Sequence, residues 1–62
     1  MRKVKYYILY ETGNEYEPTD YIDCIMWIDD DLTTSEIKEL LWEDIRESFG
    51  DKGWLGYWEV ID

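Results

Sequence analysis

Few residues in this chain could carry out catalysis. The chain contains no histidine, so the side chain that most often serves as general base or metal ligand is absent. The single cysteine, Cys24, cannot form an internal disulfide, and a nucleophilic thiol would need a partner base. Sixteen Asp and Glu among 62 residues make pairs of carboxylates inevitable by chance, and neither a Gly-rich phosphate loop nor a nucleophile elbow accompanies them. We therefore expect no enzyme activity and no cofactor, and we interpret Cys24 as a small core residue.

The run Asp29-Asp30-Asp31 is a candidate for calcium binding. An EF-hand loop requires Gly at its sixth position and Glu at its twelfth. Counted from Asp29, these positions hold Thr34 and Leu40. Negative charge just before a helix also complements the positive end of the helix dipole. We expect that structural role and no metal site.

The charge of the chain narrows the choice of partner. Six Lys and Arg stand against sixteen Asp and Glu, which gives a net charge of −10. Phosphate backbones and anionic membrane surfaces are bound by cations, so we expect neither direct nucleic-acid binding nor membrane binding. No apolar run approaches the length of a transmembrane helix or a signal-peptide core. We expect a soluble, cytoplasmic protein.

Aromatic residues make up 18% of the chain. Stacking of bases on Trp54, Tyr57 and Trp58 would still need a positive groove for the nucleic-acid backbone, which the chain lacks. We assign most aromatic residues to the core. Because Tyr and Trp are enriched in protein interfaces, we expect some of them to contact a partner: Tyr7, Trp27, Trp54 and Trp58.

The spacing of apolar residues predicts two strands, a helix and a third strand. Residues 4–10 and 20–28 are rich in β-branched and aromatic residues, and residues 4–10 carry them on both faces, which is typical of a central strand. A capping box of Thr33 and Glu36 precedes a helix over 34–49 that ends before Gly50. A last strand follows over 54–61. The apolar face of the helix is predicted to contain Ile37, Leu40, Leu41, Ile45 and Phe49.

These elements predict one α+β domain covering residues 1–62. A right-handed crossover through the helix places the third strand beside the first, so we expect a ββαβ fold with an antiparallel sheet in the order 2-1-3. The helix should pack on one face of the sheet, against the first strand and the inward face of the second. The other face remains uncovered. Because soluble monomers rarely expose a large apolar patch, we expect a homodimer that buries Trp27 and neighbouring aromatic residues.

The helix also carries an acidic stripe opposite its apolar face. Its glutamates fall within an arc of about 80°, since each residue advances about 100°, and neighbouring glutamates repel each other at a spacing of four residues. Acidic residues near the C-terminal half also oppose the helix dipole. A small domain that retains such unfavourable charge suggests a function for it. The predicted partner-binding residues are Glu36, Glu39, Glu43, Asp44 and Glu47.

A small, strongly acidic, aromatic-rich domain without catalytic groups resembles the inhibitor proteins encoded by phages and other mobile elements. The resemblance rests on size, charge and architecture, and it transfers no functional residue. It implies a counter-defence protein in the host cytoplasm that blocks a basic, nucleic-acid-handling protein, in some cases as a DNA mimic. Two alternatives remain: an accessory subunit that docks through the uncovered sheet face, and a small-ligand or Ca²⁺ binder that uses residues 11–20 and the three consecutive aspartates.

Overall fold

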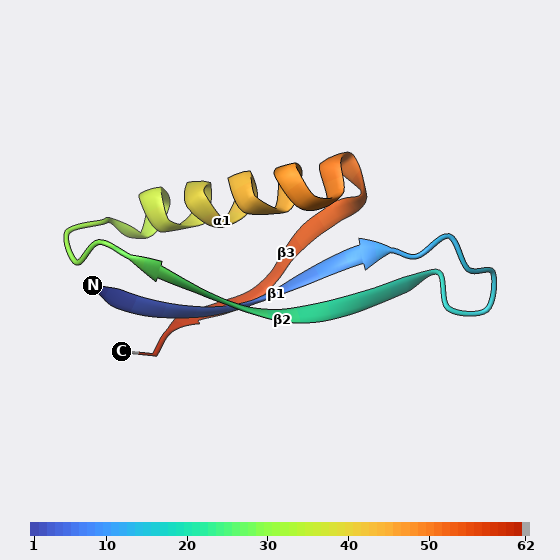
Figure 1. Cartoon of the computed structure of the whole chain (residues 1–62), viewed down its shortest axis with the longest axis horizontal. Coiled ribbons are helices and arrows are strands. Elements are labelled where there is room, and N and C mark those ends of the chain that lie inside the picture. The colour runs from blue at the N-terminus through green and yellow to red at the C-terminus, as the bar shows by residue number, and fades with distance from the viewer. Residues whose placement is uncertain (62) are drawn as a thin grey trace.

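The computed structural model describes residues 1–61, and the five elements follow in the order β1 (Arg2–Glu11), β2 (Thr19–Ile28), α1 (Thr34–Phe49), a 3-10 turn (Gly50–Lys52) and β3 (Gly53–Val60). The strands form one sheet in the order β2-β1-β3, and β1 is antiparallel to both neighbours. The predicted α+β class and ββαβ order are therefore confirmed, as is the central position of the first strand. Figure 1 shows α1 on one side of the sheet, with no element of residues 1–61 on the other side.

The helix α1 begins and ends where its capping residues predict. The Thr33 N–H donates to Glu36 Oε1 at 3.1 Å, and the Glu36 N–H donates to Thr33 Oγ1 at 3.3 Å. These bonds form the capping box and satisfy two backbone amides at the helix start. At the other end Gly50 has a φ of +63°, and its N–H donates to the carbonyl of Arg46. Glycine adopts this left-handed conformation without the penalty that a side chain would bring.

The core lies between α1 and the sheet. Phe49 is half-buried and stacks on Tyr10, with ring centroids 4.8 Å apart. Close to this stack the helix approaches the backbone of β3 so tightly that a Cβ added to Gly53 would lie 2.8 Å from Phe49 Cβ. The fully buried residues come from β1, the end of β2 and one face of α1: Val4, Tyr6, Ile8, Ile28, Ile37, Leu41 and Ile45.

One expectation about helix packing is wrong, and a second holds for only part of the sheet. Leu40, predicted to be buried, is 37% exposed. It lies about 100° around the helix from the centre of the buried face, which is Leu41. The expected packing against the inward face of the second strand is found at its end, where Ile28 is buried with Ile37 and Leu41. The helix packs chiefly on β3 and β1 and leaves the start of that face uncovered. Ile22 on that face is consequently 46% exposed.

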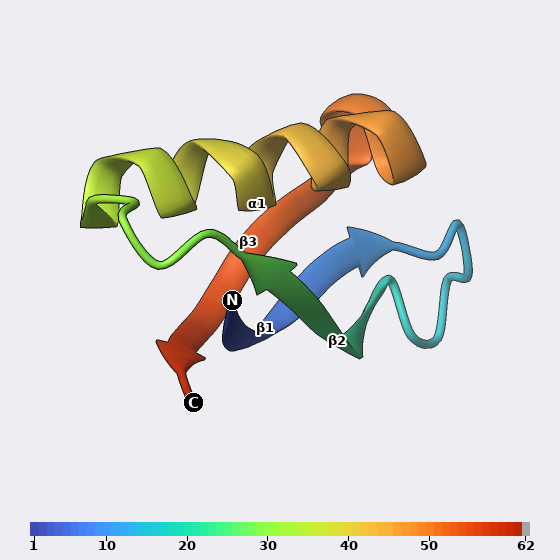
Figure 2. The ribbon, with the colours of Figure 1, turned by 60° about the vertical axis from the view of Figure 1, so that its left-hand side comes forward.

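A β-bulge interrupts the pairing of β1 with β3. Tyr6 pairs with Trp58 and Ile8 pairs with Leu55, so two residues of β3, Gly56 and Tyr57, face one residue of β1. A bulge increases the local twist of a sheet, and Figure 2 shows the strongly twisted strands.

The loop between β1 and β2, residues 12–18, projects beyond the end of α1 (Figures 1 and 2). Hydrogen bonds within the loop hold its shape: the Thr12 N–H donates to the Pro18 carbonyl at 3.1 Å, and the Tyr16 N–H donates to Asn14 Oδ1 at 2.9 Å. The Tyr16 side chain is 92% exposed. It provides an aromatic residue remote from every packed surface, which is useful as an experimental control.

Candidate functional site

Four of the predicted partner-binding residues form an exposed row on α1, which we call the glutamate stripe: Glu36, Glu39, Glu43 and Glu47. The stripe extends for about 16 Å at 1.5 Å per residue and lies opposite the buried face of the helix. Within residues 1–61 the only ion pair closer than 4.0 Å joins the Met1 amino group to Asp30, at 3.2 Å. No Lys or Arg side chain of the described residues therefore neutralises the stripe at that distance.

Asp44 belongs to the packing of the domain rather than to the glutamate stripe. Its carboxylate accepts a hydrogen bond of 2.6 Å from the hydroxyl of Tyr6, which is 3% exposed. Asp44 is half-buried because it lies only about 60° around the helix from Leu41, toward the sheet. Burial, followed by the bond to Asp44, raises the pKa of the Tyr6 hydroxyl above its usual value. Helical projection from the sequence placed Asp44 beside the glutamates and missed this bond.

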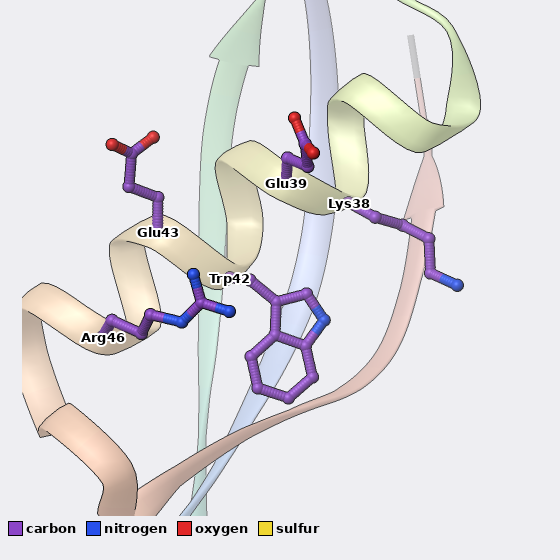
Figure 3. Close-up of a pocket in the computed structure, with 5 residues that line it drawn as sticks. All are labelled: Lys38, Glu39, Trp42, Glu43 and Arg46. Atoms are coloured by element: carbon purple, nitrogen blue, oxygen red, sulfur yellow. The ribbon is translucent and has the colours of Figure 1, made fainter.

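A second row of side chains runs along α1 next to the stripe and was not singled out from the sequence. Lys38, Trp42 and Arg46 follow each other at four-residue steps and, with Glu39 and Glu43, line a hollow of about 480 Å³. Figure 3 shows Glu39 and Glu43 extending to one side of the helix, whereas Lys38 and the Trp42 ring extend to the other. The acidic surface of α1 is therefore bordered along one flank by two cations and a half-buried indole.

The sheet face away from α1 exposes many apolar side chains. We call it the open face. Cross-strand pairing places Leu9 opposite both Tyr21 and Trp54, and Lys5 opposite both Ile25 and Glu59. Its large apolar side chains are each between 40% and 62% exposed: Leu9, Tyr21, Ile25, Trp27, Trp54, Tyr57 and Ile61.

Three of the four aromatic residues predicted to contact a partner lie on the open face. Trp27 and Trp54 are 53% and 40% exposed, and Tyr7 is half-buried between them in the sheet. Trp58 lies on the other face, because it pairs with the buried Tyr6 and packs against the core. The bulge at Gly56 shifts the alternation of β3, so the sequence pattern could not assign these faces by counting alone.

The open face also contains a hollow of about 340 Å³ beside the bulge. Tyr7 lines it and contacts Tyr21 edge to face at 5.9 Å and Tyr57 at 6.4 Å between ring centroids. Gly56 has no side chain, which leaves the hollow open between the aromatic rings. Glu59 accepts a hydrogen bond from the Tyr57 hydroxyl at 3.1 Å and raises the pKa of that hydroxyl.

The structure also shows the surroundings of the Cys24 thiol and of the acidic residues, the two sequence features considered for a reactive or metal-binding role. Cys24 is half-buried against the core, and burial, followed by the charge of Asp44, raises the pKa of its thiol. This favours the protonated, unreactive form. No group of three or more His, Cys, Asp or Glu side chains within residues 1–61 is arranged to hold a metal ion. In the same part of the chain, no helix combines the length and apolar character needed to cross a bilayer.

Comparison with known proteins gives no relative: no protein-family model, no curated protein and no solved structure matches the chain.

Proposed function

We propose that the protein is a non-catalytic binding module that occupies a basic site on another protein through the glutamate stripe. The observation that carries this proposal is the exposure of Glu36, Glu39, Glu43 and Glu47 along one side of α1 without a side-chain ion pair among residues 1–61. A stripe that served only as a solvated surface would gain stability from opposite charges at four-residue spacing. In the glutamate stripe, Glu39, Glu43 and Glu47 follow one another at this spacing, so the helix lacks that stabilisation.

The spacing of the stripe supports a nucleic-acid-handling partner. Residues four apart on a helix are separated by about 6 Å along its axis, which is close to the distance between neighbouring backbone phosphates. A groove that binds phosphates with Lys and Arg could therefore accept the stripe. The net charge of −10 would accelerate the encounter with such a site. The protein would then act as an inhibitor, in the manner of phage-encoded counter-defence proteins in a host cytoplasm.

Reversal of three glutamates tests the proposal. The triple variant Glu39→Lys, Glu43→Lys, Glu47→Lys should keep the fold, because all three side chains are exposed. The matched control reverses three exposed acids at the end of β1 and in the loop that follows it, Glu11, Glu15 and Glu17, to lysine. Both variants have the same net charge, so only the position of the change differs.

The assay is capture from a bacterial lysate by the tagged protein, followed by washes at low and high salt. We expect the parent and the loop variant to retain a common basic protein at low salt and to release it at high salt, whereas the helix variant captures none. Duplex DNA should displace the captured protein if its basic site binds nucleic acid. Equal capture by the helix variant and the parent would contradict a role for the glutamate stripe.

A second candidate function is favoured by the exposed apolar residues of the open face. An accessory subunit could dock that face on a larger complex. Such a complex would withstand high salt, because apolar contacts do not weaken when charges are screened. Salt-resistant capture that is lost on mutation of Trp27, and kept on reversal of the glutamates, would support this alternative.

A further inference from the structure

We propose that the open face binds the open face of a second copy of the chain and forms a two-fold homodimer, with the two acidic helices on its outer sides. In such a contact the same patch is used by both copies, and it must therefore complement itself. The exposed area, the local charge and the relief of the face each favour a second copy as the occupant. This homodimer does not depend on the proposed function.

The exposed apolar area suits a protein interface. An aromatic side chain has roughly 150–250 Å² to bury. The four large aromatic residues Tyr21, Trp27, Trp54 and Tyr57 are between 40% and 62% exposed, so together they present roughly 400 Å². Leu9, Ile25 and Ile61, each more than 40% exposed, add to this area. A standard interface buries about 800 Å² on each partner, so the face comes within reach of that value once its polar atoms are included.

Local charge explains why a second copy can approach this face of an acidic protein. The central part of the open face holds two lysines and two acids, namely Lys3, Lys5, Asp23 and Glu59, and is neutral. Elsewhere the chain carries the excess that gives a net charge of −10. Two copies would repel each other when they meet by their helices, whereas their open faces can meet without opposed like charge. A partner selected by strong positive charge would instead require an acidic face.

The lysines already lie on the aromatic surface. Lys3 Nζ is 5.6 Å from the centre of the Trp27 ring, and Lys5 Nζ is 5.6 Å from that of Tyr7. Their aliphatic stems cover apolar surface and can remain in a contact while the ammonium groups pair with acids. Burial of this face therefore does not isolate a charge.

The open face has both a hollow and projecting side chains, which are the two features that a self-complementary contact needs. The hollow of about 340 Å³ beside Gly56 would remain an unfilled void between two flat surfaces. Trp27 and Tyr57, at 53% and 62% exposed, project from the same face. A two-fold arrangement brings the projecting side chains of one copy toward the hollow of the other.

Light scattering at micromolar concentration tests the assembly directly. We expect a species of twice the chain mass of 7.6 kDa, with a dimer fraction that rises between roughly 0.05 and 0.5 M salt as the repulsion between the two acidic chains is screened. A species of 7.6 kDa at both salt concentrations would refute the dimer, and the open face would then belong to a different protein.

Matched substitutions locate the interface. Ile25→Glu and Trp27→Glu each place a carboxylate directly opposite a lysine, Lys5 and Lys3 respectively, so the folded monomer gains a cross-strand pair of opposite charge. In the dimer each substitution would remove an apolar contact from both copies and give the two opposed faces an excess of negative charge. We expect both variants to become monomeric at concentrations where the parent is dimeric. The control Tyr16→Glu makes the same charge change on a side chain that is 92% exposed in the loop, and it should stay dimeric. Dimers that persist in both open-face variants would overturn the proposal.

A measurement on the parent chain keeps the test independent of whether the variants fold. The four indole N–H signals in an NMR spectrum form two classes, since Trp27 and Trp54 lie on the open face whereas Trp42 and Trp58 pack against the core. Dilution across the dimer–monomer transition should shift the first pair and leave the second pair in place. Shifts confined to Trp42 and Trp58 would contradict an interface on the open face.

Discussion

Removal of the Tyr6 hydroxyl, in the substitution Tyr6→Phe, should destabilise the domain markedly. The hydroxyl is buried with a side chain that is 3% exposed, and it donates a hydrogen bond of 2.6 Å to Asp44. Phenylalanine keeps the ring and its packing, so the substitution creates no large cavity. It leaves the half-buried carboxylate of Asp44 without this donor.

The expected loss follows from the charge of the acceptor. A hydrogen bond to a charged group contributes about 1.5–3 kcal/mol, and the partial exposure of Asp44 places the expected loss near the lower end, about 2 kcal/mol. The whole domain should have a free energy of unfolding of only about 3–9 kcal/mol, at 0.05–0.15 kcal/mol per residue. In a domain of this size each kcal/mol corresponds to about 4–8 °C in Tm. The variant should therefore melt on the order of 10 °C below the parent.

Urea unfolding monitored by tryptophan fluorescence measures the effect, with thermal unfolding by circular dichroism as a second readout. The control Tyr16→Phe removes a hydroxyl from a side chain that is 92% exposed and should change the free energy of unfolding by less than about 0.5 kcal/mol. Asp44→Asn, which keeps an acceptor oxygen without the charge, should fall between the two. If Tyr6→Phe unfolds within about 0.5 kcal/mol of the parent, the bond makes no net contribution and Asp44 is available for another role.

Three further predictions concern pH, the helix cap and the helix–sheet contact. The pKa of Tyr6 in the folded state lies above its usual 10.0 because of burial and Asp44. The unfolded state therefore releases this proton first, and the free energy of unfolding falls as pH rises above about 10. Urea unfolding at stepped pH should show a smaller decrease in this free energy for Tyr6→Phe than for the parent. Thr33→Ala removes the capping bond to the Glu36 N–H and should cost about 1 kcal/mol, while an unchanged urea midpoint would contradict the role of the cap. The pKa of Glu36 is lowered chiefly by the Thr33 N–H, so its contribution is present above the usual value of 4.5 and is lost as pH falls below it. Gly53→Ala would place a Cβ 2.8 Å from Ile45 Cγ2 and Phe49 Cβ and should lower the free energy of unfolding by about 1–3 kcal/mol. Gly56→Ala has a nearest contact of 3.3 Å, to the Tyr7 carbonyl oxygen, and should lower it less. Equal urea midpoints for the two variants would contradict a close helix–sheet contact at Gly53.

Much of the fold could be predicted from the sequence because the signals involved are local. Thr33, Glu36 and Gly50 are recognisable as helix caps from their types and spacing, and α1 runs over the predicted residues, Thr34–Phe49. The strand order followed from the handedness of the crossover and from apolar residues on both faces of residues 4–10. These features depend on neighbouring residues and on chain connectivity, both of which can be read along the sequence.

The tertiary structure decided which side chains share a surface. Leu40 was expected in the core and is exposed, whereas Asp44 was expected at the surface and is half-buried. The reason is that α1 turns the row of Ile37, Leu41 and Ile45 toward β1 and β3. This orientation brings Asp44 to Tyr6. A rotation of the helix by a fraction of a turn changes these assignments without changing the pattern of apolar residues.

The faces of β3 depended on the tertiary structure in the same way. The bulge opposite Tyr7 adds one residue to β3, so Trp54 lies on the open face and Trp58 in the core. Alternation along a strand reverses at an inserted residue. Gly56 is the signal that could have indicated the insertion, since an isolated glycine within a strand often marks a bulge, but the alternation of the other residues does not show it. The composition of the chain determined that it is acidic and lacks histidine, whereas the packing of α1 on the sheet determined which acids and aromatic rings remain exposed.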